Sequence, residues 1–177
     1  MRTVRIMDKE TVMRCLARIT HEIIERNDDS LCILGVKTRG VPLSRILTEN
    51  LKKFSGEVVP CGSIDATMYR DDFTEEEKRQ RAGESFIPCD INGKTVLIVD
   101  DVLSTGRTAR AAIEAVFALG RPKTVRLAVL VDRGHREIPI QPDFVGKNIP
   151  TSRQERISVV LGSESEECGV FILNEKG

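Results

Sequence analysis

The stretch TVLIVDDVLSTGRTAR, residues 95–110, decides the fold. Residues 95–99 tolerate an apolar environment and do not alternate with polar residues, which is typical of a strand buried on both faces of a helix-covered parallel sheet. Two aspartates end this strand, and a turn of small and polar residues leads into an alanine-rich helix. The stretch therefore predicts an α/β fold built on a mainly parallel sheet.

The aspartates and the turn indicate what such a sheet would bind. Ligands of open parallel sheets lie at the carboxyl ends of the strands, where Asp100 and Asp101 stand. The turn places backbone N–H groups and hydroxyls at the start of a helix, and these groups favour a phosphate, which Gly106 allows to approach closely. Since two carboxylates repel a phosphate, they must face a hydroxyl-bearing part of the same ligand. A phosphorylated sugar meets both demands.

The rest of the chain alternates helix and strand signals. Helical spacing runs from a cap at Asp8 to about residue 27, and Pro42 lies in the first turn of a second helix that reaches about Phe54. Strand signals cover residues 31–36, 57–68, 125–131, 157–161 and 170–173. Residues 69–86 are polar and charged, so we expect a mobile loop or hairpin there, and residues 132–152 are predicted to be irregular. We expect one domain, residues 1–177.

The composition excludes several classes of protein. Lys plus Arg and Asp plus Glu number 27 each, so the overall charge predicts neither a nucleic-acid-binding nor a membrane protein. No apolar run approaches the roughly 20 residues of a membrane span, and the N-terminus turns acidic before a signal-peptide core is complete, so we expect a cytoplasmic protein. The five cysteines form no Cys-x-x-Cys pair, which indicates free thiols: Cys15, Cys32, Cys61, Cys89 and Cys168.

Residues 99–108, VDDVLSTGRT, resemble the phosphoribosyl-pyrophosphate (PRPP) motif of the type I phosphoribosyltransferases. The resemblance implies their fold, a mainly parallel sheet flanked by helices with a small hood, about residues 133–160, and a flexible lid loop, about residues 69–86. It assigns Asp100 and Asp101 to the ribose hydroxyls. It assigns the 5-phosphate to the turn, which comprises Val102, Leu103, Ser104, Thr105, Gly106, Arg107 and Thr108. It also implies Mg²⁺ bound with PRPP or pyrophosphate, and we expect no direct protein ligand to the metal.

A second turn, Lys37-Thr38-Arg39-Gly40, leaves the buried strand at residues 31–36. Taken alone, it is as well explained as a plain turn. Beside the first motif, the resemblance assigns Thr38, Arg39 and Gly40 to the pyrophosphate. Because charge develops on both fragments when pyrophosphate leaves C1 of the sugar, catalysis would rest on positioning and electrostatics, with Asp100, Asp101 and Arg39 as the catalytic residues.

The charged segment at residues 69–86 is the candidate lid, because water would compete with the acceptor base for the activated sugar. Among its cations, Arg70 and Arg79 are expected to reach the phosphates, and Lys78 and Arg81 are further candidates. The alternative is a solvated charged loop, since the acids at residues 75–77 would repel the same phosphates.

A sharper resemblance comes from LVDRGHREIPI, residues 130–140, from PDFVGKNIPTS, residues 142–152, and from YRDD, residues 69–72. Together with the two turns, these segments are similar to the PyrR family of bifunctional regulators. That resemblance implies uracil phosphoribosyltransferase activity, in which uracil and PRPP give UMP and pyrophosphate. It also implies binding to the mRNA leader of pyrimidine operons, and thereby attenuation of transcription, in response to UMP or UTP. A homodimer or higher homo-oligomer is expected.

The same resemblance suggests further site residues. Arg133 and Val159 should lie near the pyrimidine, although Arg133 could instead form an ion pair with Asp132 or Asp143. The residues that match positions used toward RNA are Arg18, His21, Arg136 and Lys147. Residues 121–156 hold eight Lys or Arg against four Asp or Glu, which permits a basic face on a neutral chain.

Three alternatives remain open. Without the resemblance, the four RNA candidates would be read as a solvated helix face and hydrogen-bonded loop residues. Ala17 and Gln141 depart from the family pattern, which favours a purely metabolic phosphoribosyltransferase for a pyrimidine or purine base, with no RNA role. A regulator whose catalysis has decayed is disfavoured, because the aspartates, Arg39 and the phosphate turn are all present.

Overall fold

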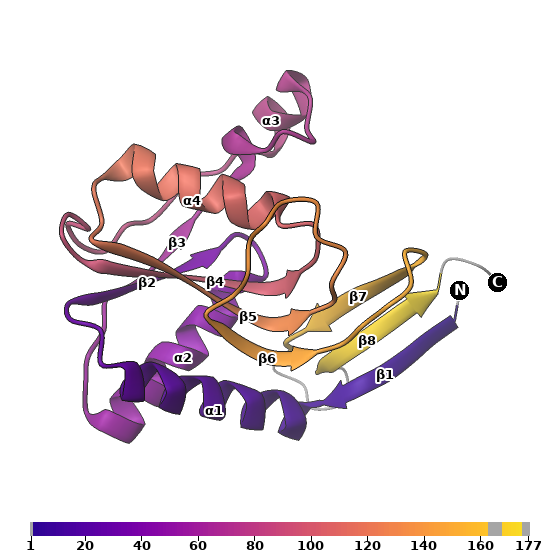
Figure 1. Ribbon diagram of the computed structural model, residues 1–177, viewed down its shortest axis with the longest axis horizontal. Helices are drawn as coiled ribbons and strands as arrows, with labels where there is room; N and C mark the ends of the chain where they lie inside the picture. The colour runs from indigo at the N-terminus through magenta and orange to yellow at the C-terminus, as the bar shows by residue number, and fades with distance from the viewer. Residues whose placement is uncertain (1, 163–167, 175–177) are drawn as a thin grey trace.

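A computed structural model describes residues 2–162 and 168–174. Its main sheet has five parallel strands in the order β3-β2-β4-β5-β6 (Figure 1). The strands are β2 (Leu31–Val36), β3 (Cys61–Ile64), β4 (Thr95–Leu103), β5 (Thr124–Asp132) and β6 (Phe144–Asn148). The predicted α/β class and the buried strand at the start of the deciding stretch are therefore confirmed.

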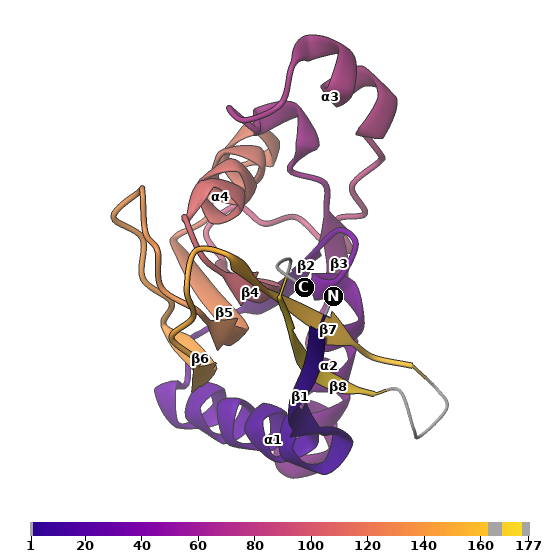
Figure 2. The same cartoon turned by 90° about the vertical axis from the view of Figure 1, so that its right-hand side faces the viewer.

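Three long helices cover the two faces of the main sheet (Figure 2). Helices α1 (Lys9–Arg26) and α2 (Gly40–Ser55) pack with side chains such as Ile33 and Leu97 on one face. Helix α4 (Arg107–Leu119) packs on the other face, where Leu34 and Ile98 lie. Successive strand residues point to opposite faces, so strands covered on both sides are apolar throughout, and this explains the runs seen in the sequence.

The first helix shows how local chemistry sets the element boundaries. The Asp8 carboxylate accepts a hydrogen bond of 2.8 Å from the amide of Thr11, as an N-cap does. The helix ends at Asn27, whose φ of 50° is left-handed. The predicted limits of α1 and α2 agree with the structure to within about two residues, which is the usual uncertainty of helix ends.

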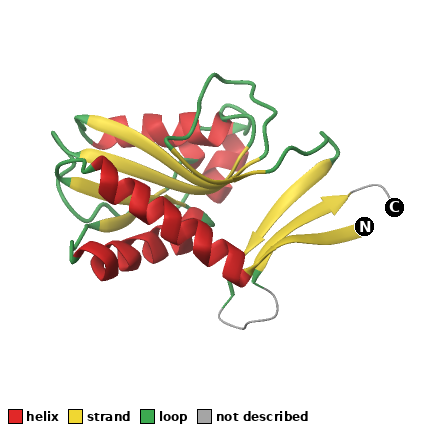
Figure 3. Ribbon diagram, turned by 60° about the horizontal axis from the view of Figure 1, so that its bottom comes forward, coloured by secondary structure: helices red, strands yellow, loops and turns green. Residues whose placement is uncertain are grey.

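A second, antiparallel sheet stands beyond the carboxyl ends of the main strands (Figures 1 and 3). Its order is β1-β8-β7, with β1 (Arg2–Asp8), β8 (Gly169–Asn174) and β7 (Glu155–Val160). The segment expected to form the hood, residues 133–160, therefore contributes only β7 to this sheet. The N-terminal strand β1 was not predicted, because strand and cap signals overlap there within a few residues.

Two segments predicted to lack regular structure contain elements. Within residues 132–152, β6 extends the main sheet at its edge. The lid segment follows a 3-10 turn, η1 (Thr67–Tyr69), and contains the short helix α3 (Glu75–Arg81). Thr74 and Glu77 form a capping box at the start of α3, and this pattern is visible in the sequence. The expectation of a loop or hairpin was therefore incomplete.

The described parts of the chain contain no helix that is both long and apolar enough to span a membrane. The five cysteines are free thiols, and Cys32 and Cys168 are buried. Burial is the main cause that raises the pKa of the Cys32 thiol to about 12, so this thiol stays protonated at neutral pH.

The start of α2 touches the end of β4 through backbone atoms. A Cβ atom on Gly40 would lie 2.1 Å from the carbonyl oxygen of Val99 and 3.2 Å from the Cα of Asp100. On β2, a Cβ on Gly35 would lie 2.7 Å from the Gly40 carbonyl oxygen. The absence of side chains at these glycines lets the turn after β2 lie directly against the aspartates at the end of β4.

We predict that Gly40→Ala lowers the free energy of unfolding by at least about 1–3 kcal/mol, because the added methyl group forces the two backbones apart. Urea unfolding followed by circular dichroism measures the change. Gly83→Ala is the matched control, since its nearest neighbour, at 3.0 Å, is the tip of the flexible Asp65 side chain. Equal losses in the two variants would contradict the close packing at Gly40.

Candidate functional site

The two aspartates near the carboxyl end of β4 form the centre of the site. Asp101 is 8% exposed, and its Oδ1 accepts a hydrogen bond of 2.8 Å from the amide of Val102. Its Oδ2 is buried and has no hydrogen-bond partner among the described residues, although the Arg39 Nη1 atom lies 3.7 Å away. A buried acceptor without a donor is costly, so this oxygen is prepared for a donor that comes from outside the protein.

The electrostatics of Asp100 and Asp101 also favour a ligand that donates hydrogen bonds. Burial raises the pKa of Asp101, and the nearby charge of Arg39 opposes that rise. Burial raises the pKa of Asp100 as well, and the negative charge of Asp101 adds to the effect. Two carboxyl groups held in this way gain from hydroxyl donors, which stabilise the charged form without requiring a second buried cation.

A pocket of about 270 Å³ opens in front of the aspartates and joins both predicted turns. Its lining residues are Val36, Lys37, Thr38, Arg39, Asp100, Asp101, Val102 and Thr108. The turn after β2 contains a cis peptide bond between Lys37 and Thr38. An adjacent pocket of about 280 Å³ is lined by Thr38, Arg39, Pro42 and hood residues 158–161, so Val159 lies on the pyrophosphate side of the predicted site.

The predicted phosphate turn forms the start of α4. Gly106 is the N-cap residue, and its φ of 90° lies in the left-handed region that favours glycine. The first amide groups of α4 have no acceptor within the helix. Thr108 is one of the first residues of α4 and lines the same pocket as the aspartates. The helix start that the sequence predicted to bind a phosphate therefore lies at the edge of this pocket.

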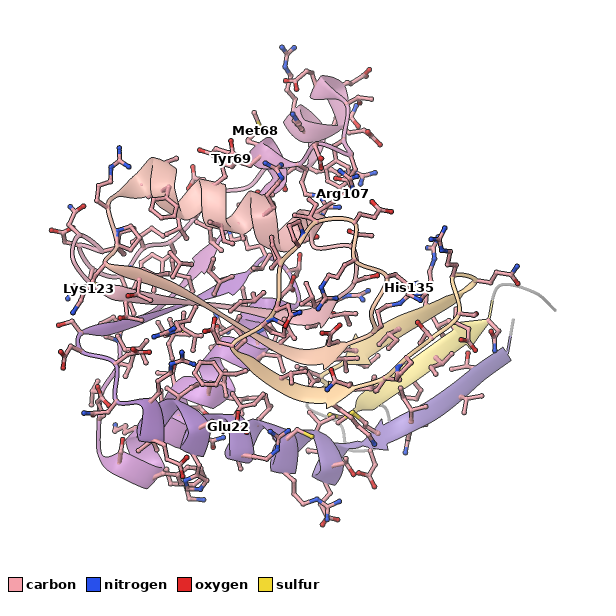
Figure 4. All side chains as sticks on the ribbon, in the orientation of Figure 1. Glu22, Met68, Tyr69, Arg107, Lys123 and His135 are labelled. Carbon is pink, nitrogen blue, oxygen red and sulfur yellow. The ribbon has the colours of Figure 1, made fainter. Side chains whose placement is uncertain are left out.

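The lid segment is docked on this helix. Arg70 donates a hydrogen bond from Nη1 to the Thr108 hydroxyl, and its guanidinium also holds Asp72, whose pKa it lowers. Arg107 pairs with Asp71 of the lid, and Figure 4 shows Arg107 at the amino-terminal end of α4. The structure therefore brings Arg70 to the phosphate turn and leaves Arg79 exposed on α3. Sequence reasoning missed Asp71, because nothing in YRDD indicates its partner.

A third pocket of about 290 Å³ lies on the other side of the turn. It is lined by Ser104, Thr105, Arg133, His135, Arg136, Glu137 and Arg153. Within it, Arg133 donates to the Thr151 hydroxyl at 2.9 Å and to the Ser152 carbonyl at 3.0 Å, and burial lowers its pKa. The alternative of an ion pair from Arg133 to Asp132 or Asp143 is not observed among the described residues, because those acids pair with other arginines.

The ion pairs of these acids also reduce the number of cations available on the predicted basic face. Asp132 is held by Arg136, and Asp143 accepts from Arg126, which in turn binds Asp28. The excess of cations counted in residues 121–156 is therefore partly neutralised inside the fold. Arg133 and Val159, expected together near one base, line separate pockets.

Three of the four predicted RNA-binding residues gather near the edge strand β6. Lys147 is exposed on this strand, and Arg18 of α1 donates at 2.5 Å to the carbonyl of Gly146. Arg136 holds Asp132, whose backbone pairs with Asn148 of β6. Arg18 and Arg136 thus bind protein atoms, and while the Arg136 side chain is 23% exposed, the Arg18 side chain is 50% exposed and Lys147 is exposed as well.

His21, the fourth predicted RNA-binding residue, stacks on Phe54 of α2. The ring centroids are 4.8 Å apart and the ring planes differ by 2°. The sequence alone could not reveal this contact, because the two residues come from different helices.

Comparisons with known proteins agree with this geometry. The family described as phosphoribosyl transferase domain matches residues 5–162. A curated relative from Alkaliphilus metalliredigens, named bifunctional protein PyrR, is 48% identical over 173 residues, which are 97% of this chain and 95% of the relative. A protein of the same name from Thermus aquaticus is 48% identical over 174 residues, 97% of this chain and 96% of the relative.

Solved structures show the same fold. The hypoxanthine phosphoribosyltransferase of Trypanosoma cruzi, solved as a point mutant in a ternary complex with substrates, is similar with a TM-score of 0.72. The match covers 97% of this chain and 95% of the other, at 18% identity. At that identity, the likeness concerns the fold alone.

Removing one lid contact should make the lid easier to cleave. In Asp71→Ala, the partner of Arg107 is lost, so we expect trypsin to cut at Lys78, Arg79 or Arg81 about 1.5 to 5 times faster, in line with an ion pair worth about 0.2–1 kcal/mol. Glu76→Ala on α3 is the control, because among the described residues Glu76 accepts a hydrogen bond from Gln80 of the same helix and from no residue outside α3. Unchanged cleavage in Asp71→Ala would show that this ion pair does not hold the lid.

Proposed function

This chain belongs to the phosphoribosyltransferase family and, within it, to the PyrR proteins; we propose that it is a uracil phosphoribosyltransferase that also regulates pyrimidine operons by binding their mRNA leader. In the transferase reaction, N1 of uracil bonds to C1 of PRPP, pyrophosphate leaves C1, and the N1 proton is released. The products are UMP and pyrophosphate. Since nucleotides and mRNA meet in the cytoplasm, we place the protein there.

One observation supports the transferase role above the others, namely the buried Asp101 oxygen in a pocket lined by both turns. We assign the ribose hydroxyls to Asp100 and Asp101, the 5-phosphate to residues 104–108, and the pyrophosphate to the turn at residues 38–40. The Arg39 guanidinium lies close enough to Asp101 to hold its carboxylate. The Arg39 side chain is also exposed, so it can contact the anionic pyrophosphate. The protein then acts by orienting the sugar and by stabilising charge on the leaving group.

Mg²⁺ fits this pocket as a companion of the phosphates. The described residues hold no cluster of three metal-ligating side chains, and Mg²⁺ often binds phosphate oxygens and water with few protein ligands. Asp100 and Asp101 would face the ion and its water, and when bound it would reduce the charge of the leaving pyrophosphate. Arg70, docked at Thr108, would help the lid to exclude water from the activated sugar.

The regulatory role rests on Lys147 of β6 and on the His21–Phe54 stack between α1 and α2. Lys147 offers an exposed charge to an RNA phosphate, and the stack offers an aromatic surface to an unpaired base. UMP or UTP would favour RNA binding only through a difference in affinity between two states of the protein. A homodimer or higher homo-oligomer would present two such faces to one leader.

A purely metabolic transferase for a pyrimidine or purine base is the second candidate. It is favoured by the inward contacts of Arg18 and Arg136, which leave fewer free cations for RNA than the sequence suggests. The two candidates differ in one property, the affinity for leader RNA.

We predict that Asp101→Asn lowers kcat/KM for PRPP by about 10- to 100-fold, since a hydrogen bond to a charged group contributes about 1.5–3 kcal/mol. Pyrophosphate release in the presence of uracil measures the rate. Asp90→Asn, an exposed aspartate before β4, is the control. A rate close to that of the unaltered protein would exclude Asp101 from the ribose site.

The pH profile should respond to Arg39. Its charge lowers the pKa of Asp101, so in Arg39→Ala that pKa rises and Asp101 is protonated up to a higher pH. The acid limb of kcat/KM for PRPP should therefore move to higher pH, in addition to an overall loss of rate. Arg39→Lys, which keeps the charge, should move the limb less. An acid limb at the same pH in all three proteins would contradict the pairing.

Leader RNA should bind more tightly when UMP is present. Coupling of about 1–3 kcal/mol corresponds to about 5- to 150-fold in affinity, which filter binding at fixed salt can measure. Lys147→Ala should weaken binding and reduce the salt slope by about 0.7–0.9. If UMP leaves the RNA affinity unchanged, the regulatory role fails; if no RNA binds at all, the metabolic candidate is correct.

A further inference from the structure

The phosphate turn has two chemically different sides. The first amide groups of α4, which begins at Arg107, are the ones proposed to bind the 5-phosphate. On the carbonyl side of the turn, Leu103 accepts a hydrogen bond of 3.0 Å from the amide of Arg133, and Thr105 accepts bonds of 2.9 and 3.0 Å from the amides of Glu137 and Ile138. The segment at residues 133–138 is thus bonded to the back of the turn.

The Arg136 side chain donates to the carbonyl that lies between these two, that of Ser104. Its Nη1 donates to the Ser104 carbonyl at 2.9 Å and to Asp132 Oδ1 at 2.8 Å, its Nη2 donates to Asp132 Oδ2 at 2.5 Å, and its Nε donates to the Ile140 carbonyl at 2.7 Å. A guanidinium has five N–H donors, and these bonds use four of them, so one remains. The side chain is 23% exposed. An arginine held in this way is part of the frame of the turn, with little left to offer to RNA.

A second contact joins the same two segments. Arg107, at the end of the turn, donates from Nε to Glu137 at 2.8 Å while it also pairs with Asp71 of the lid. Gly106 lies so close to this segment that a Cβ atom there would be 3.3 Å from the Ile138 carbonyl oxygen. These hydrogen bonds and this packing hold the turn and residues 133–138 together.

We propose that Arg136 is a positioning residue of the phosphate turn, and that through it the proposed nucleotide site is coupled to β6, which carries the exposed Lys147 proposed to contact RNA. A phosphate bound on the amide side fixes the carbonyls of residues 103–105, and these in turn fix Arg136 and the loop toward β6. By linkage, RNA must tighten nucleotide binding by the same factor. The RNA half of this inference rests on the proposed RNA binding, and the positioning half rests on the proposed assignment of the 5-phosphate to residues 104–108.

The variant Arg136→Ala separates this role from a simple contact with RNA. We expect the Kd for UMP, measured by calorimetry, to rise about tenfold, and the KM for PRPP to rise more than kcat falls, because the turn loses a charge-assisted bond at its back. Arg136→Lys should recover part of this loss, since an ammonium can still pair with Asp132. Arg121→Ala, an exposed arginine beyond α4, is the control for charge.

The coupling to RNA is tested with variants of the same segment. In Arg136→Ala, the factor by which UMP tightens leader RNA should fall toward one, and Glu137→Gln, which weakens the contact with Arg107, should lower it less. Should Arg136→Ala fail to fold, as judged by circular dichroism, Arg136→Lys and Glu137→Gln carry the test alone.

Two results would overturn the inference. UMP affinity and KM within twofold of the unaltered protein, together with lost RNA binding, would make Arg136 a direct RNA contact only. An unchanged coupling factor in Arg136→Lys and Glu137→Gln would show that the signal takes another route. If the unaltered protein binds no RNA, the proposed regulation fails, and the UMP and KM measurements still decide the positioning role.

Discussion

The site depends on one constraint, the contact between the backbones of α2 and β4 at Gly40 and Val99. Parallel neighbouring strands bring their carboxyl ends to one edge, but side chains normally keep the following turns apart. Here the glycine lets the turn at residues 37–40 lie against the aspartates, and Arg39 comes within 3.7 Å of Asp101. This contact brings both predicted turns and the aspartates to the lining of one pocket.

Much of this arrangement could be predicted from the sequence, because it is encoded in short stretches of chain. Apolar runs without alternation indicated β2, β4 and β5, and helical spacing with a cap at Asp8 indicated α1. Strand β6 was missed because its apolar positions are interrupted by Gly146 and flanked by prolines. Strand β1 was missed because its strand signal overlaps the cap signal at Asp8, and its partner β8 lies at the other end of the chain.

The site residues also divide into those that short stretches of sequence predict and those whose contacts only the fold determines. The two turns could be placed because each motif carries its own backbone chemistry. The contacts of a long side chain such as Arg107 could not, since it pairs with Asp71 and Glu137, which the fold brings near from other segments. Charge counts in a sequence therefore overestimate the cations available to a ligand. Here several arginines near the turns neutralise aspartates within the fold, and Lys147 on β6 remains exposed to solvent.

If the turn binds the 5-phosphate as proposed, its two sides give one small fold a route from the transferase site to the sensing surface. A peptide group that donates its N–H toward a ligand must point its carbonyl the opposite way, since the unit is planar. Any phosphate site built from backbone amides therefore has carbonyls at its back that need donors of their own. In this protein those donors come from residues 133–138, which lead into the edge strand β6. Satisfying the backbone at the nucleotide site thus connects it physically to a distant surface, and regulation requires only that this surface differ in affinity for a partner when the turn is filled.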